Sequence, residues 1–212
     1  ATSAMREAEN GQAIVKRVEK KLGLKIHIIS GEKESQLILK SVLNYFPQSG
    51  NYINIDVGGG STEMTIIRNH VPIISKSFPV GTVRLMDGMV DPKIWKDMEK
   101  WVLKNTKGIQ DLAALGTGGN INKLHRMLSK NANAAVPFSA LKELHNKISN
   151  LPIQERIYKL KLNPDRADVI EHAGKIYLSI MEWANIKEIY SPAAGLKEGI
   201  ILELWEKYQN PE

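Results

Sequence analysis

Hydrophobic residues along the chain switch repeatedly between helical and strand spacing. Apolar positions recur every three or four residues, as in amphipathic helices, over 3–22, 34–45, 91–107, 120–128, 138–150, 152–160, 164–184 and 195–208. Shorter runs rich in isoleucine, valine or leucine lie between them and predict strands at 25–29, 52–57, 62–68, 71–78, 112–115 and 188–191. Because strands alternate with helices, we predict an α/β fold with a mixed sheet and flanking helices.

The composition is that of a globular protein. Of the 212 residues, 42% are hydrophobic and 25% are charged, which is ordinary for a chain that buries a core. No apolar run approaches the roughly 20 residues of a membrane span, and the first residues lack a signal-peptide pattern. The chain contains no cysteine, which excludes disulfides and thiolate metal sites and fits a reducing compartment. We therefore expect a cytoplasmic protein with no membrane partner.

The formal net charge of +6 has two interpretations. The excess lysines are either spread over solvated helix faces or gathered to attract a polyanion. No basic stripe interleaved with aromatic residues is present, so the sequence predicts no nucleic-acid partner.

A run of three glycines between two predicted strands is the clearest candidate for chemistry. In the sequence IDVGGGSTE, which begins at Ile55, Asp56 and Glu63 flank the glycines. Glycines allow successive backbone N–H groups to form a nest that suits phosphate oxygens. A carboxylate beside a phosphate is repulsive unless a cation lies between them, so we predict Mg²⁺ held by the two acids. The predicted phosphate ligands are Gly58, Gly59, Gly60 and Ser61. A plain hairpin turn is the alternative.

Two further segments place polar groups at the start of predicted helices. The turn Gly116-Thr117-Gly118-Gly119 joins a strand to a helix, and amides at a helix N-terminus bind phosphate or a nucleoside. Gly116, Gly118 and Gly119 are therefore candidate phosphate-binding residues, with a turn that binds nothing as the alternative. The segment from Ser30 to Glu34 predicts, by itself, only a helix N-terminus with favourable acidic residues.

The order of these segments resembles the Ppx/GppA phosphatase family of exopolyphosphatases and guanosine pentaphosphatases. The resemblance rests on Ser-Gly-x-x-Glu from Ser30, DVGGGSTE from Asp56, the second glycine turn and AGLKEG from Ala194. ATSAMREA at residues 1–8 and NPDRAD from Asn163 extend it over essentially the whole chain. The glycine run alone is shared by the actin, hexokinase and heat-shock ATPase superfamily. The glycine run therefore implies only the fold. This fold has two ribonuclease-H-like domains of the actin-like ATPase type, with a cleft between them.

The resemblance implies a role for each matching residue. Glu34 matches the catalytic glutamate that orients or deprotonates the attacking water. Asp56 and Glu63 match the acids linked to the metal. Arg6 matches an arginine that helps to hold phosphate, and Arg166 is a weaker match that supplies another positive group near the cleft.

The implied reaction is hydrolysis of a terminal phosphoanhydride bond, with Mg²⁺ as cofactor and a place in the stringent response. The implied substrates are inorganic polyphosphate, guanosine pentaphosphate (pppGpp), or both. Lys33 stands where the family usually has an acid, and Gln36 also departs from its pattern, so the preference between the substrates stays open. A homodimer stays open as well.

One part of the family pattern does not occur in this sequence. The family opens with a strand–turn–strand hairpin that carries a first phosphate loop, and nothing like it is found here. We therefore expect that the N-terminal part is missing and that this chain alone has little phosphatase activity. In this interpretation residues 1–37, joined by the helix at 196–212, are the remainder of the first actin-like domain, and residues 38–195 form the second.

Two other classes of function remain open. A kinase or ATPase on the same fold would use the turn at 116–120 for adenosine, but no sugar-binding segment is found. Tight ATP binding would favour that class. A non-enzymatic scaffold that binds nucleotide or polyphosphate is the other, and an absence of turnover would favour it. The position of Glu34 ahead of the glycine run argues against the scaffold.

Overall fold

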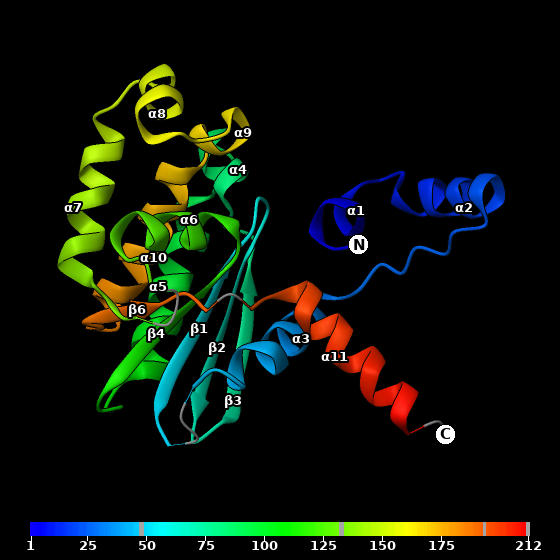
Figure 1. The fold of residues 1–212 in the computed structure, drawn as a ribbon, viewed down its shortest axis with the longest axis horizontal. Helices are drawn as coiled ribbons and strands as arrows, with labels where there is room; N and C mark the ends of the chain where they lie inside the picture. Colours follow the sequence, from blue (N-terminus) through cyan, green and yellow to red (C-terminus); the bar gives the residue numbers. More distant parts are fainter. Residues whose placement is uncertain (47–48, 132–133, 193, 211–212) are drawn as a thin grey trace.

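A single mixed sheet forms the centre of the molecule. The computed structural model describes residues 1–210 except 47–48, 132–133 and 193. The sheet has six strands in the order β3-β2-β1-β4-β6-β5 (Figure 1). Their bounds are β1 (Asn51–Val57), β2 (Thr62–Arg68), β3 (Val71–Phe78), β4 (Leu112–Thr117), β5 (Val136–Pro137) and β6 (Glu188–Tyr190). β1, β2 and β3 are antiparallel neighbours, β1, β4 and β6 run parallel, and β5 is antiparallel to β6.

Two hydrophobic cores lie on the two faces of this sheet. Ile53, Ile55 and Val57 of β1 point into the larger core, and Tyr52 points into the smaller one. Because successive side chains of a strand alternate between faces, Asp56 lies on the side of the smaller core. The helices of the larger core are α5 (Pro92–Thr106), α6 (Gly119–Leu128), α7 (Phe138–Ser149) and α10 (Ile170–Trp183). The helix of the smaller core is α3 (Gly31–Leu43), with α11 (Leu196–Gln209) packed along it.

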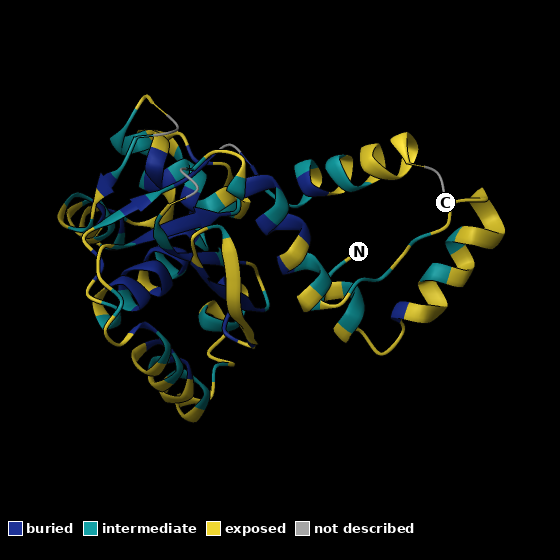
Figure 2. Ribbon diagram, turned by 90° about the horizontal axis from the view of Figure 1, so that it is seen from below, coloured by how far each residue is buried: buried dark blue, intermediate teal, exposed yellow. Residues whose placement is uncertain are grey.

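The first 30 residues extend away from the sheet, and we call them the arm. The arm carries α1 (Ser3–Glu7) and α2 (Gly11–Leu22) and is mostly exposed or half-buried, whereas β1, β2 and β4 of the sheet are mostly buried (Figure 2). The edge strand β3 is exposed along most of its length. We call the sheet with α3 to α10 the body. Within the described residues, no helix is long and apolar enough to cross a membrane.

Most predicted elements are confirmed to within a few residues, but two predicted helices are each divided. The helix predicted at 3–22 ends at Glu7 and restarts at Gly11, whose missing side chain lets the backbone close on the Met5 carbonyl. The helix predicted at 164–184 consists of α9 (Pro164–Ala167) and α10. The carbonyl of Ala167 at the break accepts a hydrogen bond from the buried Arg156 at 3.2 Å.

The strand predicted at 25–29 does not form. No strand lies beside this segment in the described part of the chain, and a strand without a ladder leaves its backbone groups unpaired. Its backbone instead makes two hydrogen bonds with Ala1. The Ala1 amino group donates to His27 O at 2.7 Å, and the Ile29 amide donates to Ala1 O at 3.0 Å. The sequence also did not predict α4 (Thr82–Met86) or β5, both very short, while α8 (Ile153–Leu160) matches its prediction. The predicted domain boundary at residue 37 lies inside α3 and stays a prediction.

Candidate active site

The glycine run forms a tight turn at the end of β1. The Gly58 amide donates to the Ser61 carbonyl oxygen at 2.9 Å and closes the turn. No described residue accepts a hydrogen bond from the amides of Gly59, Gly60 or Ser61. Gly58 and Gly59 are exposed. The turn therefore offers consecutive unpaired N–H groups to a ligand, as a phosphate nest does.

Two carboxylates stand face to face beside this turn. Asp56 on β1 is directly opposite Glu63 on β2, and the Ser77 hydroxyl donates to Glu63 Oε1 at 2.7 Å. Desolvation, followed by the charges of Glu63 and Glu34, raises the pKa of Asp56 to about 7, and a hydrogen bond from Thr117 opposes the rise. The pair therefore repels itself when both groups are ionised, and a cation between them would relieve that repulsion.

Glu34 approaches the acid pair from the first turn of α3. Burial raises its pKa, the charge of Glu63 adds to the rise, and Arg6 opposes it. Arg6 Nη1 lies 3.8 Å from Glu34 Oε2 and donates to the carbonyl oxygen of Ile29 at 2.8 Å. The structure thus brings together Glu34, Arg6, Asp56 and Glu63, which the sequence places in separate segments. A raised pKa makes Glu34 a stronger base than a free glutamate.

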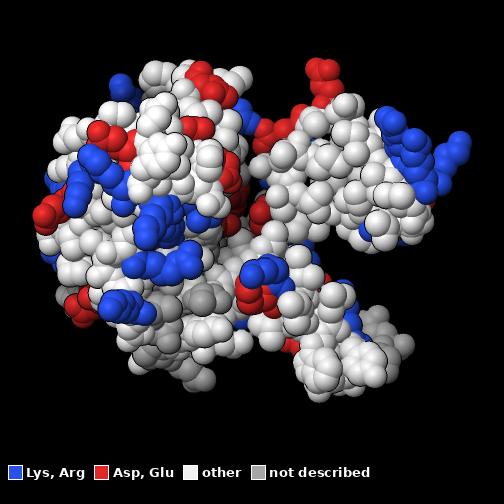
Figure 3. Space-filling view, turned by 45° about the horizontal axis from the view of Figure 1, so that its top comes forward, with Lys and Arg blue, Asp and Glu red and all other residues white. Residues whose placement is uncertain are grey.

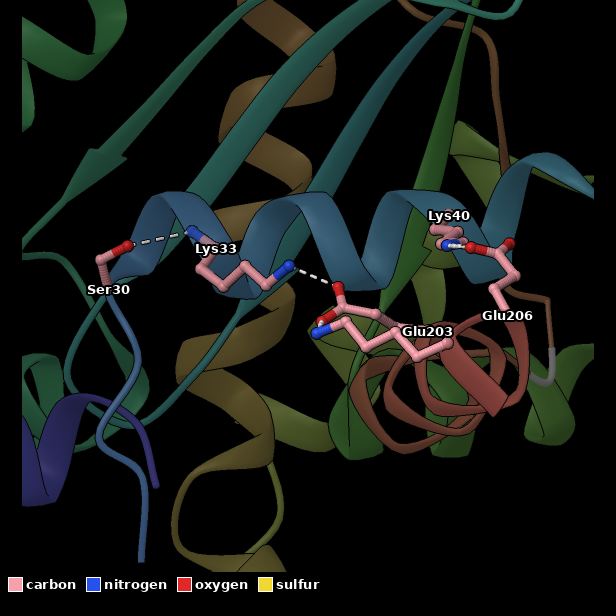
Figure 4. Close-up of polar contacts among 6 residues, drawn as sticks. Ser30, Lys33, Lys40, Glu203 and Glu206 are labelled. Carbon is pink, nitrogen blue, oxygen red and sulfur yellow. Dashed lines mark hydrogen bonds and ion pairs between the residues drawn. The ribbon is translucent and has the colours of Figure 1, made fainter. Parts of the chain in front are cut away.

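The position of Glu34 depends on how α3 is held, which Figure 4 shows. The Lys33 amide donates to Ser30 Oγ at 3.1 Å, so Ser30 caps the helix. The Lys33 ammonium pairs with Glu203 of α11, and Lys40, two turns further along α3, pairs with Glu206 (Figure 4). The lysine that departs from the family pattern therefore pairs with α11.

The second glycine turn lies against the acid pair. Gly118 has a φ of 104°, and a Cβ at that position would lie 3.1 Å from Asp56 Oδ1. Gly119 is exposed at the start of α6. Gly116, in contrast, is buried inside β4, where a Cβ would lie 2.7 Å from Ile121. Gly118 and Gly119 thus face the candidate site. Gly116 lies inside the sheet, and its role in binding phosphate stays a prediction.

A cavity of about 600 Å³ connects this turn to the start of α11. It is lined by Asp56, Thr117, Gly118, Gly119, Asn122 and the residues from Ala194 to Glu198, with Ile38 and Ile200. Acidic side chains lie beside the hollow between the body and the arm (Figure 3). This volume is large enough for a phosphate chain or a nucleotide fragment.

A second, basic pocket of about 290 Å³ adjoins the same turn. Lys123, Arg126, Lys161 and Arg166 line it, and basic side chains gather on the face of the body that Figure 3 shows. None of these side chains has an ion-pair partner in the described part of the chain. Arg166 Nη2 would lie 3.0 Å from a Cβ at Gly119. Arg166 is therefore close to the turn, as its weaker match suggested.

The acid pair fits a magnesium ion that is bound in part by substrate. Within the described residues, no group of three or more His, Cys, Asp or Glu side chains could hold a metal ion together. Mg²⁺ is commonly held by one or two carboxylates, with water and substrate phosphates as the remaining ligands. Asp56 and Glu63 supply that donor set next to the free amides of the glycine turn.

The raised pKa of Asp56 predicts a pH-dependent effect of the Asp56→Asn substitution. The folded state binds the Asp56 proton more tightly than the unfolded state, so this group lowers stability as pH rises from about 4 to about 7. In metal-free buffer at pH 8, we expect Asp56→Asn to raise the free energy of unfolding by roughly 1–3 kcal/mol. The gain should shrink as pH falls and vanish near pH 4.

Urea unfolding at pH 5 and pH 8 measures this effect. Asp97→Asn is the matched control, since Asp97 is an exposed carboxylate on α5. It should change stability little at either pH. An Asp56→Asn variant that is no more stable than wild type at pH 8 would show that the carboxylate is well solvated.

The chain is similar to known proteins over nearly its whole length. A family model described as the Ppx/GppA phosphatase family matches residues 1–208. The chain is 29% identical to "Exopolyphosphatase 1" of Mycobacterium tuberculosis over 224 residues, covering 95% of this chain and 65% of that protein. It is 24% identical to "Guanosine-5'-triphosphate,3'-diphosphate pyrophosphatase" of Pseudoalteromonas translucida, covering 100% of this chain and 45% of that protein.

A solved structure supports the fold. The structure of an exopolyphosphatase from Cytophaga hutchinsonii superposes with a TM-score of 0.83 at 21% identity, covering 97% of this chain and 73% of that one. The predicted fold class, a mixed α/β sheet of the actin-like ATPase type, is confirmed. The chain spans less than two thirds of the length of the mycobacterial relative and less than half of the pyrophosphatase.

Proposed function

Because the chain belongs to the Ppx/GppA phosphatase family, we propose that it hydrolyses the terminal phosphoanhydride bond of inorganic polyphosphate, of pppGpp, or of both. One observation carries the proposal. The charge of Glu63 acts on Glu34, the charge of Glu34 acts on Asp56, and Asp56 and Glu63 flank the glycine turn, whose Gly59, Gly60 and Ser61 amides have no acceptor among the described residues. A base, a donor set for a cation and a phosphate nest thus lie together, as phosphoryl transfer to water requires.

In the proposed reaction the terminal phosphate lies in the glycine turn, where the amides of Gly59, Gly60 and Ser61 donate to its oxygens. Glu34 orients a water molecule in line with the bond to the bridging oxygen and accepts one of its protons. The bond from the water oxygen to phosphorus forms as the bond to the bridging oxygen breaks. The products are inorganic phosphate and a substrate shorter by one phosphate. Positioning and electrostatics supply most of the rate in such transfers.

Two groups of side chains complete the proposed site. Asp56 and Glu63 would hold Mg²⁺, which neutralises charge on the transferred phosphoryl group. The basic pocket with Lys123 and Arg166 would hold negative charge further along the substrate, since its cations have no ion-pair partner in the part of the chain that the structure describes. We also propose that the protein acts in the cytoplasm, in keeping with the absence of cysteine.

Phosphate release tests the proposal, with polyphosphate and pppGpp assayed side by side over a Mg²⁺ titration. We expect Mg²⁺-dependent release from at least one substrate, at a low rate when this chain is assayed by itself. Glu63→Gln should raise the Mg²⁺ concentration at half-maximal activity about tenfold or more, because one of two carboxylate ligands is lost. Glu143→Gln, an exposed acid on α7, is the control and should behave as wild type.

Binding of ATP and of polyphosphate, measured beside phosphate release, separates the two alternatives. Tight ATP binding without phosphate release from either substrate would favour a kinase or ATPase. Binding of polyphosphate without turnover would favour a scaffold. Wild-type Mg²⁺ dependence in Glu63→Gln would assign Glu63 a structural role.

A further inference from the structure

The short helix α4 supports the glycine turn from behind. The Thr82 amide donates to Gly58 O at 3.0 Å, and the Val83 amide donates to Gly59 O at 2.9 Å. The contact is close because a Cβ at Gly81 would overlap the carbonyl of Gly59. The amides of α4 thus donate to the carbonyl oxygens of the turn. The amides of Gly59, Gly60 and Ser61 have no acceptor among the described residues and can donate to a ligand.

Arg84 of α4 reaches past this contact to the turn itself. Its Nε donates to the carbonyl oxygen of Gly60 at 2.7 Å, and its Nη2 pairs with the carboxylate of Glu7. No described residue accepts a hydrogen bond from Nη1. A guanidinium with unused donors is therefore anchored by Nε beside the predicted phosphate position. Arginine has five donors in a planar fork that matches phosphate oxygens.

Glu7 belongs to α1, which contacts both halves of the site. Its neighbour Arg6 faces Glu34, while Glu7 faces Arg84, and a Cβ at Gly60 would lie 3.3 Å from the Ser3 hydroxyl. The Glu7 side chain is 44% exposed and that of Arg84 is 28% exposed. Ion pairs this exposed contribute little to stability, so a purely structural role explains the pair poorly.

We propose that Arg84 is a phosphate-binding residue and that Glu7 competes with the substrate for it. The proposal rests on the proposed function, because it takes the glycine turn as the phosphate site. When a phosphate binds the turn, Arg84 keeps its Nε bond to Gly60 and exchanges the Glu7 carboxylate for a phosphate oxygen. Both partners are anions, so the guanidinium stays neutralised throughout. Release of Glu7 also frees α1 from the turn, and α1 carries Arg6 beside Glu34.

Binding of inorganic triphosphate with Mg²⁺, measured by calorimetry, tests the exchange. We expect Glu7→Gln to tighten binding about three- to tenfold, because the competing carboxylate is removed. Arg84→Gln should weaken binding about tenfold or more, and Arg84→Lys should restore part of the loss. In the Arg84→Gln background, Glu7→Gln should have no further effect. Glu9→Gln, an exposed acid between α1 and α2, is the control for the change in net charge.

The outcomes distinguish this inference from the proposed function. The proposed exchange of Glu7 for phosphate is wrong if Glu7→Gln weakens binding or leaves it unchanged, or if Arg84→Gln binds triphosphate as the wild type does. In either case the phosphatase assignment stands. If the wild-type protein neither binds triphosphate nor hydrolyses it, the proposed function fails and the exchange fails with it. Should Glu7→Gln not fold, the comparison of Arg84→Gln with Arg84→Lys still decides the role of Arg84.

Discussion

Replacing Glu34 with glutamine is expected to lower kcat about 100-fold or more while leaving substrate affinity nearly unchanged. Glutamine keeps the size of the side chain and one hydrogen-bond acceptor, but it cannot take a proton from the attacking water. In the proposed site the substrate contacts come mainly from the glycine turn and the basic pocket, which the substitution does not touch. The loss should therefore fall on kcat and leave KM almost as it was.

Glu32→Gln is the matched control for this substitution. Glu32 is an acid in the same helical turn, but it is exposed and lines a separate pocket beside β3. It should retain wild-type kcat. If Glu34→Gln also turns over substrate at the wild-type rate, Glu34 is not the base, and the attacking water must be activated elsewhere.

The pH profile adds an independent check on Glu34. Burial raises the pKa of this group, with the charge of Glu63 as the next cause and Arg6 opposing both. Activity that requires ionised Glu34 should fall as pH drops through this raised pKa. Arg6→Gln removes the opposing charge, so the acidic limb of the profile should move to higher pH. A limb that stays in place would show that Arg6 does not act on Glu34.

Substituting alanine for Gly199 is expected to damage both stability and catalysis. α3 and α11 touch through their backbones at this residue. An added Cβ would lie 2.5 Å from the Leu37 carbonyl carbon and closer still to its oxygen. Backbone atoms cannot rotate away as a flexible side chain can, so the helices must separate. We expect a loss of about 1–3 kcal/mol in the free energy of unfolding, the usual cost of overpacking.

The effect on kcat should exceed what the loss of stability explains. Glu34 lies in the first turn of the same helix, one turn before Leu37. A displacement of about 1 Å in a catalytic group can cost roughly 100-fold in rate. The ion pairs of Lys33 and Lys40 with α11 are partly exposed, so they cannot hold the helices in place against the new side chain. Urea unfolding and kcat, measured at a temperature where the variant is fully folded, separate the two effects.

Leu204→Ala on the exposed face of α11 is the control for Gly199→Ala. Leu204 is 61% exposed, so truncating it should alter neither the helix crossing nor kcat. A Gly199→Ala variant with wild-type stability and kcat would show that α3 and α11 do not pack closely in solution.

The sequence by itself determined the order of the elements and the local features that depend on near neighbours. Strand and helix periods predicted β1 to β4 and most helices, because these patterns reflect which side of each element is buried. The glycine run between two predicted strands also placed Asp56 and Glu63 on either side of one turn. The structure adds the antiparallel register in which the two acids oppose one another.

Only the tertiary structure decided the features that depend on distant partners. The segment at 25–29 has strand composition, but no strand lies beside it among the described residues, and a strand forms only where a neighbour supplies its hydrogen bonds. Lys33 looked like a change at the site, yet its partner is Glu203, 170 residues away. Gly116 resembled a ligand-binding glycine and is buried against Ile121.

The site itself shows the same division. Local chemistry identified Asp56, Glu63 and the glycine turn, but the approach of Glu34 depends on packing of α3 between the sheet and α11. The role of α4 was not predicted, since a helix of five residues carries too short a pattern to recognise. Spacing along a chain encodes which face of an element is buried. Which other element covers that face is decided by the complementary shapes of surfaces far apart in sequence, such as the backbone contact at Gly199.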